Sequence, residues 1–552
     1  MMHPDRLATV AHTPGNEEPA IPSALPEPGR RSFIPDSILS AVLPVLFSAV
    51  AYGPLLLNYF HSDDFANMYD IANSGVLEFA LRPHGGHVLV LRDLIFIAFY
   101  KLFGLSSRYY FASVLLTHLL NVYLLGRIIR RITRSPRLAC FGATLWGTAL
   151  LHAGGAWSES SLGWYSVYGQ TLATTLFLWV FDDLSRSADA QRAIPRGRMI
   201  AWYLSLIAGT VSFGVGIPIA MSFAATILLL APRIPRRRNL VLVFSSLAVV
   251  VPALYLGLHH LYAVVYAANF DQAAGLIDKT DQWRSIAEMF VELLAFGTGA
   301  LAIPYPCSGD TMAASCYAFD GLVILGMVVT LAVAKTATRR NLLAFLLAAT
   351  SIYFIIAVGR GPSITMFKAP LEWGARQSRY HYAASANVAV VLAMLLGQLG
   401  RLRALRARWR DALLLAWLGF MAFELFAVRG PLDHHQGSRT ETEDVLRNVE
   451  AVVDSAPESS NVYLEDQLFG SILWGRAGRP EAFPGWAAVF VMAYPDNVVR
   501  GRRLFFVYRD DRALALIRAT KYPRINSLLV APEEVPFGTV IQKPPLPSRP
   551  PF

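Results

Sequence analysis

The chain has 552 residues, of which 54% are hydrophobic and 16% charged, and its mean hydropathy is +0.41. Ordinary soluble domains carry about 25% charged residues, so this composition excludes a soluble multidomain enzyme and indicates an integral membrane protein. The formal net charge is +10 and there are only three cysteines, which excludes a cysteine-rich disulfide or zinc scaffold.

Residues 1–36 are polar and rich in proline, and we expect a disordered cytoplasmic tail there. The first apolar run, Ser37–Phe60, is long enough to cross the ~30 Å hydrocarbon core of a bilayer. Ten more such runs lie at about 109–126, 138–154, 164–181, 199–214, 215–231, 240–262, 318–334, 341–358, 382–399 and 412–428. The sequence therefore predicts an all-α polytopic membrane protein with about eleven transmembrane helices.

Every second connection between these runs is rich in arginine. The basic groups are Arg127 to Arg137, Arg186 to Arg198, Arg233 to Arg238, Lys335 to Arg340 and Arg401 to Arg410. Connections of this kind face the cytoplasm, which predicts that the N-terminus is inside and that the chain after Val428 is outside. The net charge is thus explained by topology, and we expect no nucleic-acid partner.

Two other apolar stretches, residues 88–104 and 286–303, would reverse this alternation if they crossed the membrane. Both mix apolar with charged side chains, as Arg92, Asp93 and Lys101 illustrate. We therefore expect amphipathic helices that lie at the outer face or are partly re-entrant. The alternative is that one of them is a short true crossing.

The composition divides the chain into a transmembrane domain, residues 37–428, and a more polar region after it. In residues 429–543 a helix-like stretch precedes short β-like runs at 461–464, 487–492, 504–508 and 527–530, which predicts a small exported α/β domain. Residues 544–552 form a proline-rich tail.

The first outer loop, residues 60–108, begins with two adjacent carboxylates, Asp63 and Asp64. One interpretation is structural, because Ser62 or Asp63 is typical of a residue that caps a helix N-terminus. The other is catalytic, because a carboxylate in a water-poor cleft can accept a proton from an acceptor group.

The same loop contains Arg82 and the turn His84-Gly85-Gly86-His87. A metal site formed by Asp63, Asp64, His84 and His87 is an alternative on chemical grounds, since carboxylates with imidazoles suit Mn or Zn. Two histidines across a Gly-Gly pair are a weak signal, and the main expectation is that no cofactor is needed.

The order of these features resembles the GT-C superfamily of integral-membrane glycosyltransferases. A first span is followed by an outer Asp-Asp, a His-Gly-Gly-His turn, an amphipathic helix ending in Lys101-Leu102-Phe103-Gly104, and a span ending in Tyr123-Leu124-Leu125-Gly126-Arg127. This is similar to the polyprenyl-phosphate-sugar-dependent branch, which includes protein O-mannosyltransferases and aminoarabinose transferases. That branch usually has His-Pro-Pro-Leu where this chain has His84-Gly85-Gly86-His87, which is a departure from the pattern.

The resemblance implies a catalytic acid residue at Asp63 or Asp64, with a marginal preference for Asp64. It also implies a second acidic residue at the outer end of the third span, where Glu159 lies; the alternative for Glu159 is a solvated turn residue. Arg82, His84 and His87 are expected to support the loop.

A donor lipid of this family carries a phosphate, which needs cations at the membrane surface, and arginine pairs two phosphate oxygens at once. The outer loop before residue 382 is unusually basic for its side of the membrane. The predicted phosphate-binding residues there are Lys368, Arg376, Arg379, Tyr380 and His381. The alternative is that Arg379 snorkels and Tyr380 belongs to an interfacial aromatic belt.

Cys307 and Cys316 lie in one predicted outer loop, where an oxidising compartment favours a disulfide between them. Cys140 lies inside a predicted span and is expected to be inert.

These features together predict inverting glycosyl transfer at the outer face of a bacterial inner membrane. The donor is a polyprenyl-phosphate-linked sugar, the acceptor a glycan, lipid or protein, and the exported domain is periplasmic. The nearest alternative is a metal-assisted oligosaccharyl transferase that uses a diphosphate-linked donor. A transporter of lipid or glycan is the alternative from another class, although we find no inverted repeat of the kind transporters carry.

Overall fold

The computed structural model describes residues 35–36, 38–60, 63–84, 87–153, 160–266, 282–302, 314–366 and 371–399, and short pieces beyond residue 411. The predicted tails at 1–34 and 544–552, and most of the predicted exported domain, lie outside the described residues.

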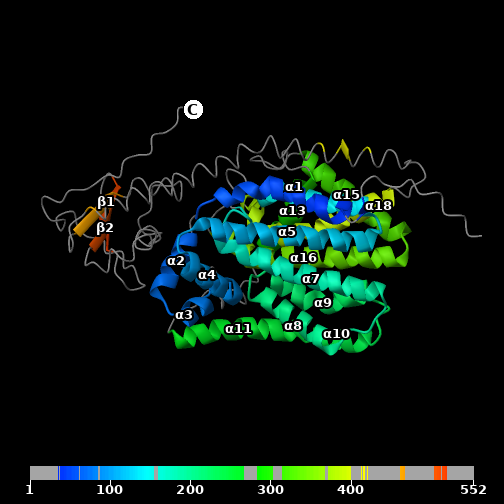
Figure 1. Ribbon diagram of the computed structural model, residues 1–552, viewed down its shortest axis with the longest axis horizontal. Helices are drawn as coiled ribbons and strands as arrows, with labels where there is room; N and C mark the ends of the chain where they lie inside the picture. The colour runs from blue at the N-terminus through cyan, green and yellow to red at the C-terminus, as the bar shows by residue number, and fades with distance from the viewer. Residues whose placement is uncertain are drawn as a thin grey trace, which may run out of the picture.

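The described part of the chain before residue 400 is built from helices, as Figure 1 shows. Their bounds are η1 Ile38–Val42, α1 Leu43–Tyr52, η2 Gly53–Leu57, α2 Asp63–Asn73, α3 Val76–Leu81, α4 Val90–Phe103, α5 Ser107–Thr133, α6 Pro136–Gly147, η3 Leu150–His152, η4 Tyr165–Val167, α7 Tyr168–Asp189, α8 Arg196–Thr210, α9 Gly216–Leu230, α10 Arg237–Ser245, α11 Leu247–Val265, α13 Trp283–Ala302, α15 Ala314–Val333, α16 Thr336–Met366, α17 Leu371–Ala375, η6 Ser378–Tyr380 and α18 Tyr382–Leu399.

Within the described residues, five helical segments are long and apolar enough to cross a membrane. They are Ile38–Leu57, Ser107–Thr133, Arg237–Val265, Thr336–Pro362 and Tyr382–Leu399, and two shorter apolar helices lie at Gly216–Leu230 and Tyr317–Val333. The prediction of a helical membrane protein is therefore confirmed, whereas the number of about eleven crossings remains a prediction.

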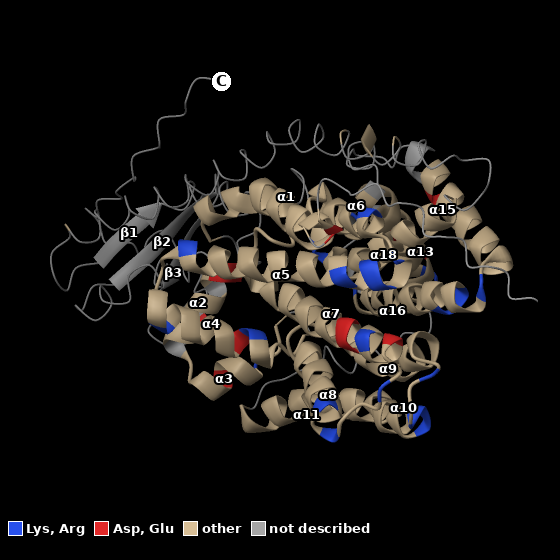
Figure 2. Cartoon of the chain, turned by 45° about the vertical axis from the view of Figure 1, so that its right-hand side comes forward, with Lys and Arg blue, Asp and Glu red and all other residues tan. Residues whose placement is uncertain are grey.

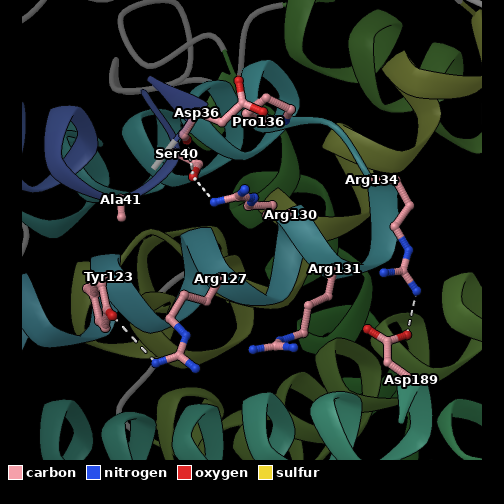
Figure 3. A pocket seen from close by; sticks show the side chains of 10 residues that line it. All are labelled: Asp36, Ser40, Ala41, Tyr123, Arg127, Arg130, Arg131, Arg134, Pro136 and Asp189. Carbon is pink, nitrogen blue, oxygen red and sulfur yellow. Dashed lines mark hydrogen bonds and ion pairs between the residues drawn. The ribbon is translucent and has the colours of Figure 1, made fainter. Parts of the chain in front are cut away.

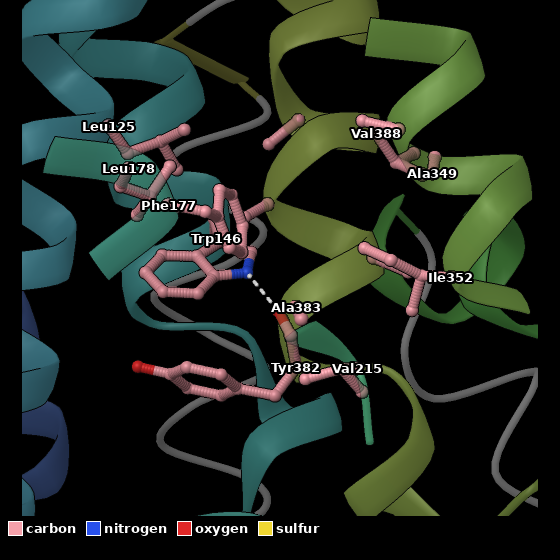
Figure 4. Packing of buried hydrophobic residues seen from close by; sticks show 14 of the residues in the cluster. Leu125, Trp146, Phe177, Leu178, Val215, Ala349, Ile352, Tyr382, Ala383 and Val388 are labelled. Carbon is pink, nitrogen blue, oxygen red and sulfur yellow. Dashed lines mark hydrogen bonds between the residues drawn. The ribbon is translucent and has the colours of Figure 1, made fainter. Parts of the chain in front are cut away.

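The core of the bundle is formed where α18 packs between α5, α6 and α16. Most of α18 is buried, and alanines predominate along it, so neighbouring helix backbones approach closely. Figure 4 shows Trp146 of α6 against the start of α18, where its indole Nε1 donates to the Tyr382 carbonyl at 3.3 Å and to Ser385 Oγ at 3.0 Å. These bonds satisfy a buried polar group that the lipid could not.

Ion pairs join the helix ends that carry the predicted cytoplasmic arginines. Asp182 of α7 accepts from two α5 residues, Arg127 at 2.9 Å and Arg131 at 3.1 Å, and Arg198 of α8 lies 3.3 Å from Asp183. Figure 2 shows basic residues around α10 and the neighbouring helix ends, and others beside α2 and α4. The basic residues of the predicted cytoplasmic connections thus gather at one end of the bundle; which compartment that end faces remains a prediction.

Several predicted runs have different ends in the structure. The run expected at 138–154 becomes α6 and stops at Gly147, and the run expected at 164–181 becomes a 3-10 turn, η4, before α7 begins at Tyr168. Residues 88–104 and 286–303 do form helices, α4 and α13, and α13 packs on α16, α17 and α15.

Three short strands form one sheet in the C-terminal region: β1 Asn461–Glu465, β2 Arg503–Asp510 and β3 Ala513–Arg518. β1 pairs parallel to β2, with Asn461 opposite Arg503, and β2 pairs antiparallel to β3, with Phe505 opposite Arg518. β1 and β2 coincide with two of the predicted β-like runs, and β3 was not predicted. The exported location of this region remains a prediction.

We expect Asp182→Asn to destabilise the bundle more than Asp189→Asn. Asp182 is nearly buried and serves two arginines, whereas Asp189 pairs with Arg134 at 2.5 Å in a largely exposed position. Loss of Asp182 should cost about 1–3 kcal/mol because it leaves partly buried arginines unpaired, and loss of Asp189 about 0–1 kcal/mol.

Thermal unfolding of both variants in the same detergent measures the difference. Equal unfolding midpoints would show that burial at Asp182 does not matter.

Candidate functional site

The two adjacent carboxylates of the first outer loop occupy different environments at the start of α2. Asp64 is fully buried, and its Oδ1 accepts from the Ser166 backbone N–H at 2.7 Å and from Ser166 Oγ at 2.6 Å. Asp63 is exposed in the first helical turn. Ser166 thus anchors α2 through Asp64, and Asp63 is the carboxylate that is exposed.

The first turn of α2 is fixed from a second direction by Asn67. Its Nδ2 donates to the Asp63 carbonyl at 2.7 Å and to Ser166 Oγ at 2.9 Å. The helix N-terminus also favours the ionised form of a carboxylate placed there. The exposed Asp63 therefore stands on a rigid turn, as a proton acceptor must.

The marginal preference for Asp64 as the catalytic residue does not follow from this geometry, because its side chain is enclosed and already accepts two strong hydrogen bonds. The helix predicted after Asp63 is confirmed. The catalytic role of either carboxylate remains a prediction.

His84 and His87 form a tight backbone bridge. The His84 N–H donates to the His87 carbonyl at 2.9 Å, and the His87 N–H donates back to the His84 carbonyl at 3.0 Å. The two residues between them in sequence are glycines, the type that two-residue turns favour. This bridge sends the two imidazoles to different neighbours.

The His84 ring turns toward a buried ion pair in α4. Its Nε2 lies 3.6 Å from Asp93 Oδ2, and Asp93 pairs with Arg92 at 2.9 Å while both are almost completely buried. Burial raises the pKa of Asp93 to about 7, although the Arg92 and Arg82 charges lower it. Arg92 and Asp93, two of the charged residues that suggested an interfacial α4, are thus packed inside the protein, whereas Lys101 is exposed.

The His87 ring instead meets the end of α16. Its Nε2 lies 2.9 Å from Arg360 Nη2, and its ring stacks on Phe213 with centroids 5.3 Å apart. Burial and the Arg360 and Arg379 charges lower the pKa of His87 to about 3. Since His87 is neutral at pH 7, its Nε2 accepts the hydrogen bond and helps to aim the Arg360 guanidinium.

Arg379 lies beside the same group of residues, held by aromatic rings. Its guanidinium is 5.2 Å from the Trp164 ring centroid and 5.1 Å from that of Tyr380, and its Nη2 donates to the Tyr380 hydroxyl at 3.4 Å. Burial raises the pKa of Tyr380, but the Arg379 and Arg360 charges outweigh it and lower the pKa below its usual value. Two guanidinium groups therefore act on one buried tyrosine.

Arg360, Arg379 and His87 define a cationic site. Every charged or titratable side chain that shifts the pKa of His87 is basic, namely Arg360, Arg379, His259 and Arg92. The local field thus favours an anion.

Serine residues fasten this cationic site to the segment before α7. Ser161 Oγ donates to the Ser378 carbonyl at 2.7 Å, the Ser161 N–H donates to Ser378 Oγ at 3.2 Å, and Ser378 Oγ donates to the Leu151 carbonyl. Trp164 and Ser166 lie two residues apart in this segment. The Trp164 ring contacts the Arg379 guanidinium, and the Ser166 hydroxyl donates to Asp64. One short segment thereby links the cationic site to the paired carboxylates.

Arg82 joins three helices, and its predicted role in supporting the loop remains a prediction. Its guanidinium joins Asp70 of α2 at 2.7 Å, Glu78 of α3 at 3.1 Å and the Tyr262 hydroxyl of α11 at 3.2 Å. The outer-loop helices are thus tied to a candidate membrane span.

His381 has both ring nitrogens engaged inside the fold, and its predicted phosphate-binding role remains a prediction. It is fully buried, its Nδ1 lies 3.0 Å from the Tyr353 hydroxyl and its Nε2 lies 2.6 Å from the Ala375 carbonyl. Burial lowers the pKa of His381 to about 4, so it is neutral and holds the fold. Arg376 is half-buried in the turn after α17, and its phosphate-binding role remains a prediction.

Other predicted residues cannot be placed. Glu159, Lys368 and Cys307 lie outside the described residues, and only the backbone of Cys316 is described, so the second acidic residue and the disulfide remain predictions. Cys140 is a buried free cysteine.

The alternative metal set is not assembled. Asp64 is bound to Ser166, and His84 and His87 face different partners. Within the described residues, His, Cys, Asp and Glu form no group of three or more that could hold a metal ion.

Sequence reasoning missed Ser166 and Trp164. Both were assigned to the start of a membrane span because the stretch from Trp164 to Tyr168 is aromatic. The signal available was Ser166 itself, a small polar residue within an aromatic segment next to a predicted outer connection.

Comparison with known proteins adds a distant likeness. A scan against protein-family models and a search of curated proteins found no match. The chain is similar to the crystal structure of ArnT from Cupriavidus metallidurans bound to undecaprenyl phosphate, with a TM-score of 0.42 and 12% identity over 85% of this chain and 93% of that one.

We expect His87→Gln to make the protein less sensitive to acid. Because the pKa of His87 is about 3 in the folded protein and about 6.5 when unfolded, the unfolded chain binds a proton first as pH falls. Stability is therefore lost between about pH 6.5 and 3, by about 1–2 kcal/mol between pH 7 and pH 5. Glutamine does not titrate and still offers Arg360 an acceptor.

Unfolding midpoints of the wild type and variant at pH 7 and pH 5 test this. The prediction is wrong if both proteins lose the same stability over that interval.

Proposed function

We propose that the protein is an integral-membrane glycosyltransferase that uses a polyprenyl-phosphate-linked sugar and inverts the anomeric carbon. One observation carries this proposal. The segment from Trp164 to Ser166 contacts Arg379 of the cationic site and also, through Asp64, holds the helical turn that presents the exposed Asp63. We infer further that the reaction takes place at the outer face of a bacterial inner membrane, because the basic connections lie at the other end of the bundle.

Asp63 is the general base in this proposal. Its carboxylate takes the proton from the acceptor hydroxyl or amide, whose lone pair attacks the anomeric carbon from the face opposite the phosphate. Asp64 is a positioning residue that acts through Ser166 and the first turn of α2. This division of roles follows from the exposure of one carboxylate and the enclosure of the other.

Arg360 and Arg379 hold the leaving group. As the bond between the anomeric carbon and the phosphate oxygen breaks, the lipid phosphate gains negative charge, which two nearby guanidinium groups stabilise. His87 is neutral and accepts from Arg360, so it aims the arginine without competing for the phosphate. Arg376 and Lys368 are proposed to extend this site, and Glu159 to approach the acceptor.

The donor is a lipid because the anion site adjoins helices of the membrane domain. Arg360 lies near the end of the span Thr336–Pro362, and Arg379 directly precedes the span Tyr382–Leu399. A phosphate held between them leaves its polyprenyl chain in the bilayer.

We expect Asp63→Asn to lower kcat by about 10²–10⁴-fold, because the amide cannot accept the proton, with little effect on the amount of folded protein. Asp64→Asn should retain more activity, since an amide oxygen can still accept from Ser166. Transfer is measured in purified membranes with a panel of polyprenyl-phosphate hexoses and pentoses.

The assignment of roles is overturned if Asp64→Asn is inactive while Asp63→Asn is active. Full activity of the double variant would refute the proposed mechanism altogether.

We expect Arg360→Gln and Arg379→Gln each to lower kcat/KM for the lipid donor by about 10–100-fold, the range for a lost charge-assisted hydrogen bond. The matched control is Arg108→Gln, an exposed arginine at the outer-loop end of α5. An equal loss in the control would show that general surface charge, and not a defined phosphate site, governs donor binding.

A further inference from the structure

A cation-lined cavity lies at the arginine-rich end of the bundle. Its volume is about 520 Å³, and Figure 3 shows it between the start of η1 and the C-terminal turns of α5. The lining residues are Asp36, Ser40, Ala41, Tyr123, Arg127, Arg130, Arg131, Arg134, Pro136 and Asp189. Arginines therefore supply most of its charged lining.

The acids of this cavity do not balance its arginines. Asp182 accepts from Arg127 and Arg131, and Asp189 accepts from Arg134. The four guanidinium groups face three carboxylates, including the exposed Asp36, so one positive charge remains uncompensated. A single phosphodiester supplies the matching charge.

Arg130 carries that uncompensated charge. Its Nη1 donates to the Ser40 hydroxyl at 3.2 Å, and in the part of the chain that the structure describes it forms no ion pair. Arg130 is exposed and lines the cavity, where Figure 3 shows its guanidinium directed toward Ser40. This arrangement fits an oxyanion that accepts from several donors.

The cavity lies across the membrane from the proposed catalytic site. Tyr110, near the outer-loop end of α5, contacts Phe60 with ring centroids 4.9 Å apart, whereas Arg130 lies in the last turns of the same helix. Residues 110 to 130 correspond to about 30 Å of helix, the thickness of the hydrocarbon core. The cavity is therefore a separate site at the opposite interface.

Apolar side chains lead from the cavity along the lipid-facing surface. Leu116, Leu120 and Tyr123 are exposed and share one face of α5 with Arg127, because they are spaced by three or four residues. On the opposite wall, Val42 in η1 is also exposed. An acyl chain can follow these side chains while its phosphate occupies the cavity.

We propose that this cavity binds one anionic glycerophospholipid from the leaflet on the arginine-rich side, with the phosphate between Arg130 and its neighbouring arginines. The proposal is independent of the catalytic assignment, since it uses none of the same residues. A headgroup and a free phosphate share the same oxyanion chemistry, but only the lipid also uses the apolar face of α5.

The test uses the full-length protein purified in detergent with equal amounts of phosphatidylglycerol and phosphatidylcholine, and native mass spectrometry to count the lipid retained. The wild type should retain phosphatidylglycerol preferentially. Arg130→Gln should lower that preference by about fivefold, the effect of one basic residue on an anionic lipid. Ala41→Trp should lower it as well, because the indole fills the cavity without changing its charge.

The matched control is Arg238→Gln, an exposed arginine of another basic connection at the same end. It should leave lipid retention unchanged, and gel filtration should show every variant to be monodisperse.

Three outcomes overturn the proposal. An equal loss in Arg238→Gln shows diffuse attraction to surface charge, and no loss in Ala41→Trp shows that the lipid lies elsewhere. Complete displacement of phosphatidylglycerol by inorganic phosphate identifies a site for the free anion.

Discussion

The low dielectric of the bilayer is the constraint on which this structure depends. An ionised side chain inside the bilayer must be paired or must lie at the membrane surface. The described residues meet that constraint by moving charge to the two ends of the bundle and pairing what stays inside. Asp182 forms ion pairs with two arginines at one end, and Arg92 forms an ion pair with Asp93 at the other. The cationic groups around Arg360 and around Arg130 are the places where we propose that an anionic ligand binds.

Much of the architecture was predictable because it follows from hydropathy and from the arginine-rich character of every second connection. Arg379 was singled out for the same reason, because the pattern predicts few cations on its side of the membrane; its role remains a prediction. The helices at 88–104 and 286–303 were also anticipated. The interior role of Arg92 and Asp93 was not, since an amphipathic pattern does not show whether its polar face meets water or a buried partner.

The finer arrangement of the candidate site could not be predicted because it depends on residues far apart in sequence. The sequence around Asp63 and Asp64 does not show which of the two side chains is exposed. The difference comes from Ser166, about a hundred residues later, which donates to Asp64. His381 looked like a member of a basic cluster, yet Tyr353 and Ala375 hold both of its ring nitrogens. A residue's neighbours along the chain thus suggested its chemistry, while its neighbours in space determined whether that chemistry is available.

The hydrogen bonds between Ser161 and Ser378 fix the segment from residue 160 to residue 168 to the turn before α18. The same few residues hold Asp64 at one point and Arg379 at another, so a shift of this segment moves both together. In the proposed mechanism, the carboxylates and the phosphate-binding arginines are therefore positioned as one unit.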